Sequence, residues 1–283
     1  MPELPEVETI VLSLRDRISG KKINKVVVQF EKCLGNISAG EFKKILTGAK
    51  IISLSRRAKY IIFELSNKYF LFLHLRMTGK VLLKIQSAPI TKHDHVMIYL
   101  NDNQCIFYND TRKFGRFFVT QSPEIVLGKL GPEPLGEDYN FSNFSQKITK
   151  TQRTIKALLL DQTFVAGLGN IYTDEALWMA KIHPEQPAHS LSKIKRKALF
   201  EAIKCVLTQG IANRGTSLGD GQGNYTSSDH QSGTNQHSLK VFARTGSPCP
   251  ECRTMIQKSV VAQRGTHYCP KCQKLKLINS KAT

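Results

Sequence analysis

Residues 249–272 read CPECRTMIQKSVVAQRGTHYCPKC, and their four cysteines decide how the end of the chain folds. Two C-x2-C pairs, Cys249 with Cys252 and Cys269 with Cys272, are separated by sixteen residues. Two knuckles with this spacing can close a tetrahedral thiolate site on zinc. Because four thiolates leave no coordination position open, the metal is expected to stabilise a small module and not to catalyse. The sequence therefore predicts one structural Zn2+.

Between the cysteine pairs, residues 260–268 (VVAQRGTHY) predict the tip of a hairpin. Arg264 lies in this tip, where it is either a solvated charge or a phosphate-directed finger. The other cysteines, Cys33, Cys105 and Cys205, lie far apart in apolar or amphipathic surroundings. They are expected to be buried, reduced thiols of a cytosolic protein.

The composition points to the kind of partner. The 283 residues include 41 Lys and Arg against 22 Asp and Glu, a formal net charge of +19. Such an excess indicates a polyanion, most commonly nucleic acid, and a ribosome-associated protein is the alternative. No stretch has the apolar length of a membrane span, and the first residues lack the pattern of a secretory signal. We expect a cytoplasmic protein that binds nucleic acid and no membrane.

Outward from the cysteines, the pattern of residues changes several times. Residues 215–238 are almost wholly small or polar, which is typical of a functional loop. Helical periodicity precedes them from about residue 150. KLGPEPLGED, at 129–138, holds two prolines and two glycines and reads as a linker. Residues 23–120 are rich in short β-branched and aromatic runs separated by turn residues.

These changes predict an α+β chain in which an antiparallel β-sandwich with one helix comes first. The domains are expected at 1–130 (catalytic β-sandwich), 131–149 (linker), 150–238 (helical, with the loop at 215–238) and 239–283 (zinc finger).

A glycine-rich turn in the second half of the chain suggests an anion site. In VAGLGNIYTDE, residues 165–175, two glycines precede a helix that is expected to begin near Asn170. Such a turn presents N–H groups and the positive end of the helix dipole to a phosphate. A plain helix–helix turn is the alternative.

Two segments of the strand-rich region carry a second signal. HLRMTG at 74–79 and NDTRKFGR at 109–116 hold Met77, Arg112 and Phe114. These are either ordinary core and surface residues or side chains that a protein inserts into DNA to fill a gap.

The first residues, MPELPEVETI, suggest chemistry at the chain terminus. Pro5 suits the first turn of a helix over residues 5–20, but this leaves Pro2 and Glu3 unexplained. Once the initiator methionine is removed, Pro2 is a free secondary amine, and terminal amines titrate at roughly 7.7–8.0. Such an amine can attack an aldehyde-like carbon and form an iminium, with Glu3 moving protons and Glu6 ordering the site. An unremarkable terminus is the alternative. Lys59 is likewise an edge lysine or a reactive amine.

The chain closely resembles bacterial formamidopyrimidine-DNA glycosylases (MutM) of the Fpg/Nei family. The resemblance covers nearly the whole length through, in order, PELPEVET, RRAKY, HLRMTG, KHDH, DTRKFG, LGPEPL, GLGNIYTDEAL, KIHPE and AQRGTHYCPKCQ. It implies an N-terminal β-sandwich followed by a helix-two-turn-helix domain with a zinc finger. It also implies a monomeric glycosylase and lyase that removes 8-oxoguanine and formamidopyrimidines from double-stranded DNA and cuts the strand by β,δ-elimination.

Residue by residue, the resemblance implies that Pro2 is the Schiff-base nucleophile at C1′ and that Glu3 is the acid that helps to open the sugar. Lys59 then assists β-elimination, and Arg264 serves δ-elimination and phosphate contact. The side chains implied to fill the space of the flipped base are Met77, Arg112 and Phe114. The implied DNA-binding residues are Glu6, His74, His93, Arg112, Arg153 and Asn170.

The sequence departs from the family pattern at a few positions. Gln152 stands where a basic residue is common, so the phosphate contact is assigned to Arg153. Gly219-Asp220-Gly221 replaces a basic residue and an Asp-aromatic pair in the loop that covers the purine, which leaves lesion preference open. Val11 and Leu12 replace an arginine pair, and this change is expected to be neutral.

Three rival functions fit part of the pattern. A Nei-like glycosylase would favour oxidised pyrimidines, although the opening PELPEVE argues against it. A non-catalytic zinc-ribbon protein that binds damaged DNA would tolerate the loss of Pro2 and Glu3. An RNA-binding ribosomal accessory protein fits the charge and the zinc but does not explain the N-terminal motif.

Overall fold

The computed structural model describes residues 1–217 and 233–276, which form two compact units. The first unit combines residues 1–129 with 210–236, and the second combines 130–209 with the chain from 237 onward. Of the predicted loop at 215–238, residues 218–232 lie outside the described residues, and so do Gly219, Asp220 and Gly221.

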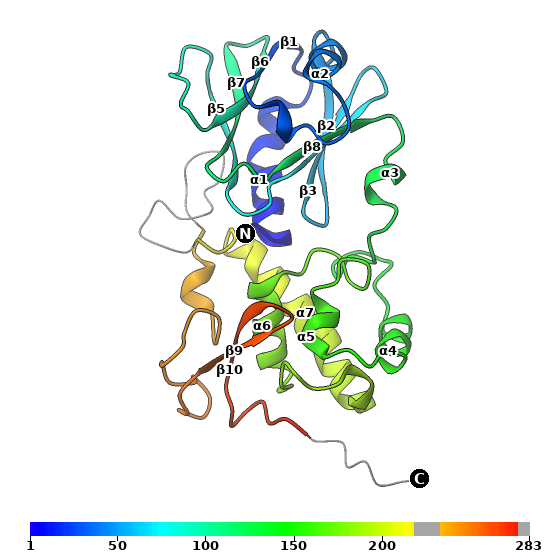
Figure 1. Ribbon diagram of the computed structural model, residues 1–283, viewed down its shortest axis with the longest axis vertical. Helices are drawn as coiled ribbons and strands as arrows, with labels where there is room; N and C mark the ends of the chain where they lie inside the picture. Colours follow the sequence, from blue (N-terminus) through cyan, green and yellow to red (C-terminus); the bar gives the residue numbers. More distant parts are fainter. Residues whose placement is uncertain (218–232, 277–283) are drawn as a thin grey trace. The chain divides into compact units, whose positions relative to one another are not determined.

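The first unit contains two four-stranded antiparallel sheets (Figure 1). One has the strand order β1-β6-β7-β5, from Ile23–Val28, Asp94–Leu100, Gln104–Asp110 and Gly79–Ile85. The other has the order β2-β3-β4-β8, from Ile51–Arg57, Tyr60–Leu65, Phe70–His74 and Arg116–Thr120. The antiparallel β-sandwich predicted from the alternating pattern is confirmed.

Helix α1 (Leu4–Ile18) supplies much of the core of this unit. Its apolar residues recur at helical spacing, and Val7, Ile10 and Leu14 are buried in one cluster with residues from both sheets. Burying a side chain of this size contributes roughly 1.5–3 kcal/mol. The helix therefore holds the chain terminus against the sandwich. The unit also contains η1 (Glu31–Cys33), α2 (Ala39–Leu46) and the short α3 (Glu124–Leu127).

The second unit is helical and ends in the cysteine module. Its helices and strands are α4 (Phe141–Thr149), α5 (Ile155–Leu159), α6 (Asn170–Met179), η2 (Ala188–Ser190), α7 (Lys193–Ala212), η3 (Asn235–Ser238), β9 (Gln257–Val261) and β10 (Arg264–Tyr268). The boundaries between the two units fall within α7 and within η3. Helix α4 lies inside the segment 131–149, which the sequence analysis expected to be a linker, because Phe144 and Ile148 recur at helical spacing and are buried. Strands β9 and β10 pair in register around Ala262 and Gln263, which both have positive φ. The predicted hairpin at Arg264 is therefore present.

Candidate active site

The residues that directly follow the exposed Met1 are buried. Glu3 and Glu6 are each 1% exposed, and Pro2 is buried beside them. The Glu6 carboxylate accepts the backbone N–H of Glu3 through Oε2 at 2.9 Å and that of Thr216 through Oε1 at 2.7 Å. Glu6 thereby fixes the backbone next to Pro2 and ties it to the described start of the 215–238 loop.

Lys59 lies in the tight turn between β2 and β3 and is 6% exposed. The preceding residue, Ala58, has φ 53°, so the chain reverses direction within two residues. Arg56 braces this turn, because its guanidinium donates to Glu8 of α1 at 2.5 Å and to the Ala58 carbonyl at 3.2 Å. The helix that directly follows Pro2 and Glu3 is thus linked to the turn that carries Lys59.

His74 ends β4 directly opposite Tyr60, the residue after Lys59, and the two rings meet edge to face at 4.9 Å. Burial lowers the pKa of His74 to about 3, with a further contribution from the positive charges of Arg76 and Lys59. The ring is therefore neutral at pH 7. Because Nδ1 accepts the Arg76 backbone N–H at 3.0 Å, the ring hydrogen lies on Nε2, where it can be donated to a phosphate oxygen.

Two adjacent turns carry Met77, Arg112 and Phe114. The Arg112 guanidinium stacks 4.7 Å from the centroid of the Phe114 ring, which is 45% exposed. An exposed aromatic ring under a guanidinium is poorly explained by core packing. Gly115 is required beside them, because a Cβ there would collide with the Tyr108 hydroxyl. His93 is half-buried, and its carbonyl accepts the Asp110 N–H at 3.0 Å.

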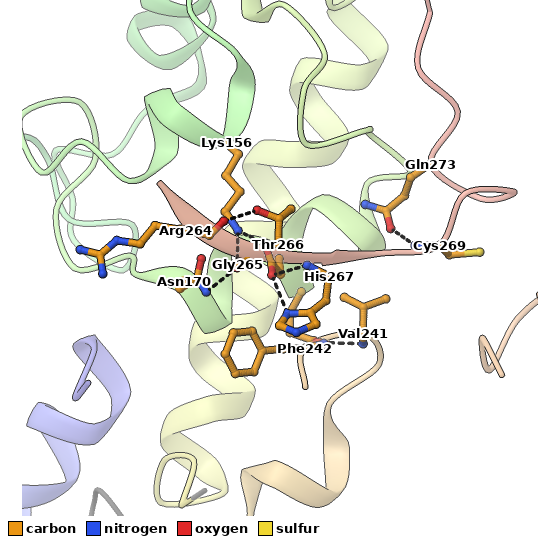
Figure 2. Close-up of polar contacts among 12 residues, drawn as sticks. Lys156, Asn170, Val241, Phe242, Arg264, Gly265, Thr266, His267, Cys269 and Gln273 are labelled. Carbon is orange, nitrogen blue, oxygen red and sulfur yellow. Dashed lines mark hydrogen bonds and ion pairs between the residues drawn. The ribbon is translucent and has the colours of Figure 1, made fainter. Parts of the chain in front are cut away.

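The second unit brings Asn170 and Arg264 together. Asn170 begins α6 and donates its side-chain amide to the Gly265 carbonyl at 2.8 Å (Figure 2). Arg264, the preceding residue, is exposed, and Figure 2 shows its side chain pointing away from these contacts. The glycine turn and the finger hairpin therefore meet, which their separation in the sequence did not reveal.

A fully buried ion pair that the sequence analysis missed supports this meeting point. Lys156 of α5 lies 2.6 Å from Asp174 of α6, and both side chains are fully buried. Asp174 also accepts the His267 backbone N–H at 2.9 Å, and Lys156 donates to the Gly265 carbonyl at 3.3 Å. The signal in the sequence was a charged residue within each of two apolar helical runs, TIKALLLD and NIYTDEALWM.

Arg153 is already engaged within the second unit. Its guanidinium forms an ion pair with Asp161 at 2.7 Å and donates to the Ala157 carbonyl at 2.8 Å. Two of its five N–H groups are therefore used within the protein.

The four cysteine sulfurs fit a zinc ion. All lie within 4.8 Å of one another, and two of the separations are 3.9 Å and 3.4 Å. Zn–S bonds of about 2.3 Å in a tetrahedron place the sulfurs roughly 3.8 Å apart. Cys249, Cys252, Cys269 and Cys272 would hold the ion, and Trp178, the only tryptophan in the sequence, packs against their cluster.

A β-sandwich with a buried N-terminal Pro-Glu pair, joined to a helical unit with a four-cysteine hairpin, defines a zinc-finger DNA repair enzyme of the helix-two-turn-helix class. Three family descriptions match consecutive parts of the chain: the formamidopyrimidine-DNA glycosylase N-terminal domain at residues 1–117, the H2TH domain of the same enzymes at 130–221, and a zinc finger found in FPG and IleRS at 246–275. The chain belongs to the formamidopyrimidine-DNA glycosylase family.

Individual members of the family are similar to this chain over nearly its whole length. It is 44% identical to the formamidopyrimidine-DNA glycosylase of Protochlamydia amoebophila, over 97% of this chain and 100% of the relative. The enzyme of Ligilactobacillus salivarius is 43% identical, over 98% and 100%. The Lactococcus lactis enzyme in complex with Fapy-dG-containing DNA superposes with a TM-score of 0.89 at 39% identity, covering 96% of this chain and 100% of that one. The same enzyme with abasic-site DNA superposes at 0.90 with 40% identity, over 96% and 99%. The predicted family, enzyme class and fold are confirmed.

Proposed function

We propose that this protein is a bifunctional DNA glycosylase and lyase that removes formamidopyrimidines and 8-oxoguanine from double-stranded DNA and then cuts the strand. The observation that carries the proposal is the buried Pro2-Glu3 pair, with Glu6 fixing the backbone at Glu3. The relatives add the substrate class, since the Lactococcus lactis enzyme has been crystallised with both Fapy-dG and abasic-site DNA.

In the proposed reaction, the Pro2 nitrogen forms a bond to C1′ of the damaged nucleotide as the bond from C1′ to the base breaks. The base leaves with the electron pair of that bond and takes up a proton, and the Pro2 nitrogen loses its proton. Glu3 supplies a proton to the ring oxygen, the sugar opens, and an iminium links Pro2 to C1′. The iminium acidifies C2′, so that loss of a proton there expels the 3′ phosphate. A second proton loss expels the 5′ phosphate, and water then hydrolyses the iminium and frees Pro2. The zinc of the four-cysteine site would take no part in these steps, because four thiolates leave it no open position.

The remaining residues are proposed to bind and position the DNA. Lys59 assists the first elimination and Arg264 the second. The neutral His74 donates Nε2–H to a phosphate beside the flipped nucleotide, and Asn170 contacts another. The side chains proposed to fill the vacated space are Met77, Arg112 and Phe114, and further contacts to DNA are assigned to His93 and Arg153.

The domain boundaries predicted from the sequence, at 130, 149 and 238, remain part of the proposal. So do a monomeric state and a location in the bacterial cytoplasm on the nucleoid. Within residues 1–217 and 233–276, no helix is long and apolar enough to cross a membrane.

Borohydride trapping tests the proposal. Protein with its methionine removed is mixed with duplex DNA that carries 8-oxoguanine opposite cytosine, a formamidopyrimidine or an abasic site. We expect a covalent adduct that maps to Pro2 with all three. Pro2→Gly should abolish it, and Pro5→Ala, a matched change one turn along in α1, should keep it.

The other outcomes separate the rivals. Trapping on an oxidised pyrimidine in preference to 8-oxoguanine would move the protein to the Nei-like class. Trapping on abasic DNA alone would keep the lyase and remove the proposed purine substrates. Binding to damaged DNA without any adduct would establish the non-catalytic reading.

A further inference from the structure

Asp110, at the end of β7, is fully buried, and both oxygens of its carboxylate are used by the protein. Oδ1 accepts the Thr78 hydroxyl at 2.5 Å and the Arg112 backbone N–H at 3.1 Å. Oδ2 accepts the Tyr108 hydroxyl and the Gly115 backbone N–H, both at 2.9 Å. Four donors from three parts of the chain therefore converge on one carboxylate.

The backbone of Asp110 adds two further links. Its N–H donates to the His93 carbonyl at 3.0 Å, and its carbonyl lies 2.7 Å from His95 Nε2. A carbonyl can only accept, so Nε2 of His95 carries a hydrogen.

The carboxylate is ionised at neutral pH. Burial alone would raise the pKa of Asp110, but the hydrogen bonds from Thr78, Gly115, Tyr108 and Arg112 outweigh burial and hold the pKa below its ordinary value. Hydrogen bonds to an ionised acceptor are roughly twice as strong as neutral ones.

The donors stand beside the side chains proposed to enter the duplex. Thr78 directly follows Met77, Arg112 is itself one of the three, and Gly115 directly follows Phe114. The turn that carries Met77 and the turn that carries Arg112 and Phe114 therefore share one anchor, and the same residue holds the backbone of His93.

We propose that Asp110 is a positioning residue that sets Met77, Arg112 and Phe114 as one rigid wedge, so that the three enter the DNA together when the damaged base leaves the stack. The inference rests on the proposed function of these side chains. A rigid wedge offsets the unstacking cost of base extrusion without first losing the entropy of ordering two loops. Because Asp110 is fully buried and both of its carboxylate oxygens are used within the protein, its effect should be confined to the insertion step.

Asp110→Asn tests this role, because an amide nitrogen cannot accept the two donors that meet at the oxygen it replaces. Asp94→Asn is the matched control. Asp94 is also fully buried and accepts Thr91 and Asn109, but no donor from either wedge turn. If Asp110→Asn does not fold, a second pair of variants tests the same role. Thr78→Val removes the hydroxyl donor at nearly the same side-chain volume, whereas Thr78→Ser keeps a hydroxyl at this position.

Two rates are compared with the full-length, zinc-loaded protein. The first is excision of 8-oxoguanine paired with cytosine, with 2-aminopurine beside the lesion to report insertion by fluorescence. The second is borohydride trapping at a preformed abasic site opposite a gap, where no base needs to be displaced. We expect Asp110→Asn and Thr78→Val to slow insertion and excision on the order of tenfold or more. Asp110→Asn leaves buried donors without their acceptor, and Thr78→Val removes one of the donors to the carboxylate. Trapping at the gapped site should change by less than about twofold.

The controls decide the interpretation. Thr78→Ser and Asp94→Asn should retain the wild-type ratio of the two rates. The role of Asp110 would be overturned if Thr78→Val and Thr78→Ser had the same ratio of excision rate to trapping rate. It would also be overturned if Asp110→Asn slowed excision and trapping by the same factor. If Phe114→Ala leaves excision unchanged, the wedge itself is refuted and the inference with it. Failure of the wild-type protein to form the Pro2 adduct would instead refute the proposed function.

Discussion

Asp110 in the first unit and Asp174 in the second are both fully buried aspartates that accept backbone N–H groups from a segment with proposed DNA contacts. Their other partners differ. Asp110 is held by the neutral hydroxyls of Thr78 and Tyr108, whereas Asp174 lies 2.6 Å from the ammonium of Lys156. The hairpin that Asp174 supports ends in a four-cysteine metal site, and the turns around Asp110 belong to a β-sandwich.

The difference follows from how much core each region has. The turns around Asp110 emerge from strands with a large shared core, so hydrogen bonds from uncharged donors to one carboxylate suffice to fix them. The finger hairpin has two five-residue strands and a small apolar cluster around the cysteines. A module of this size does not bury enough surface to fold alone, so metal and a buried charge pair carry the stability. The two regions should therefore respond differently to the loss of zinc, to the loss of a charged partner and to a fall in pH.

Removing zinc should have the largest effect and should be confined to the finger. Structural zinc contributes an apparent binding free energy of about 10–16 kcal/mol in small fingers. Chelation is expected to unfold β9 and β10, displace Arg264 and abolish strand cutting, while the sandwich stays folded. Trp178 packs against the cysteine cluster, so its fluorescence reports the change.

Cys252→Ser and Cys205→Ser form the matched pair for this prediction. The prediction that Cys205 is buried was wrong, because this thiol of α7 is exposed, whereas Cys33 and Cys105 are buried. Substitution of Cys205 should leave zinc content, Trp178 fluorescence and cleavage unchanged. Cys252→Ser should lower all three. If the protein loses its zinc but keeps its Trp178 fluorescence and its cleavage of abasic DNA, the finger does not depend on zinc for its fold.

Breaking the buried pair should have the next largest effect. Lys156→Met leaves the fully buried Asp174 carboxylate without its lysine partner. Removing one partner of a buried ion pair typically lowers the free energy of unfolding by about 3–5 kcal/mol. Thr78→Val in the first unit removes one neutral donor and is expected to cost about 1–3 kcal/mol. Urea unfolding followed by far-UV circular dichroism measures both.

Lys193→Met, an exposed lysine of α7, is the control and should fall within about 0.5 kcal/mol of wild type. If Lys156→Met costs no more than Thr78→Val, the distinction between an aspartate held by a charged partner and one held by uncharged donors is wrong.

The sequence was enough to predict the features that depend on the periodicity of apolar residues and on the spacing of cysteines. Strand alternation predicted the sandwich, and cysteine spacing predicted the zinc finger, because each is a local property of the chain. Asp110 and Lys156 were missed for a physical reason. A charged residue inside an apolar segment is acceptable only if it meets partners from elsewhere in the fold, and those partners are distant in sequence: Gly265 lies 109 residues from Lys156, and Thr78 lies 32 residues from Asp110.

The same limit applies to the site residues. The resemblance supplied Pro2, Glu3 and Glu6 as separate positions, but not the contact between Glu6 and Thr216, 210 residues apart. Nor did it show that Arg153 is paired with Asp161. Such contacts are set by tertiary structure, and no local pattern carries them.

The smallest expected effect is a pH dependence of the free energy of unfolding, and it comes from His74 in the first unit. The pKa of His74 is lowered to about 3 in the folded protein, mainly by burial. The unfolded chain takes up a proton near pH 6.5, roughly the ordinary value for histidine. The stability that depends on neutral His74 is therefore complete above about pH 6.5 and is lost at up to about 1.4 kcal/mol per pH unit as the pH falls towards 3.

His74→Asn isolates this effect, because the Asn side-chain oxygen can accept the Arg76 N–H in place of Nδ1 while the titrating ring is gone. Between about pH 7 and about pH 5, the wild-type protein should lose about 2 kcal/mol more unfolding free energy than the variant. Urea unfolding at the two pH values measures the difference. Parallel curves for wild type and His74→Asn would mean that His74 takes up its proton in the folded state as readily as in the unfolded chain, and its assignment as a neutral Nε2–H donor to phosphate would then fail.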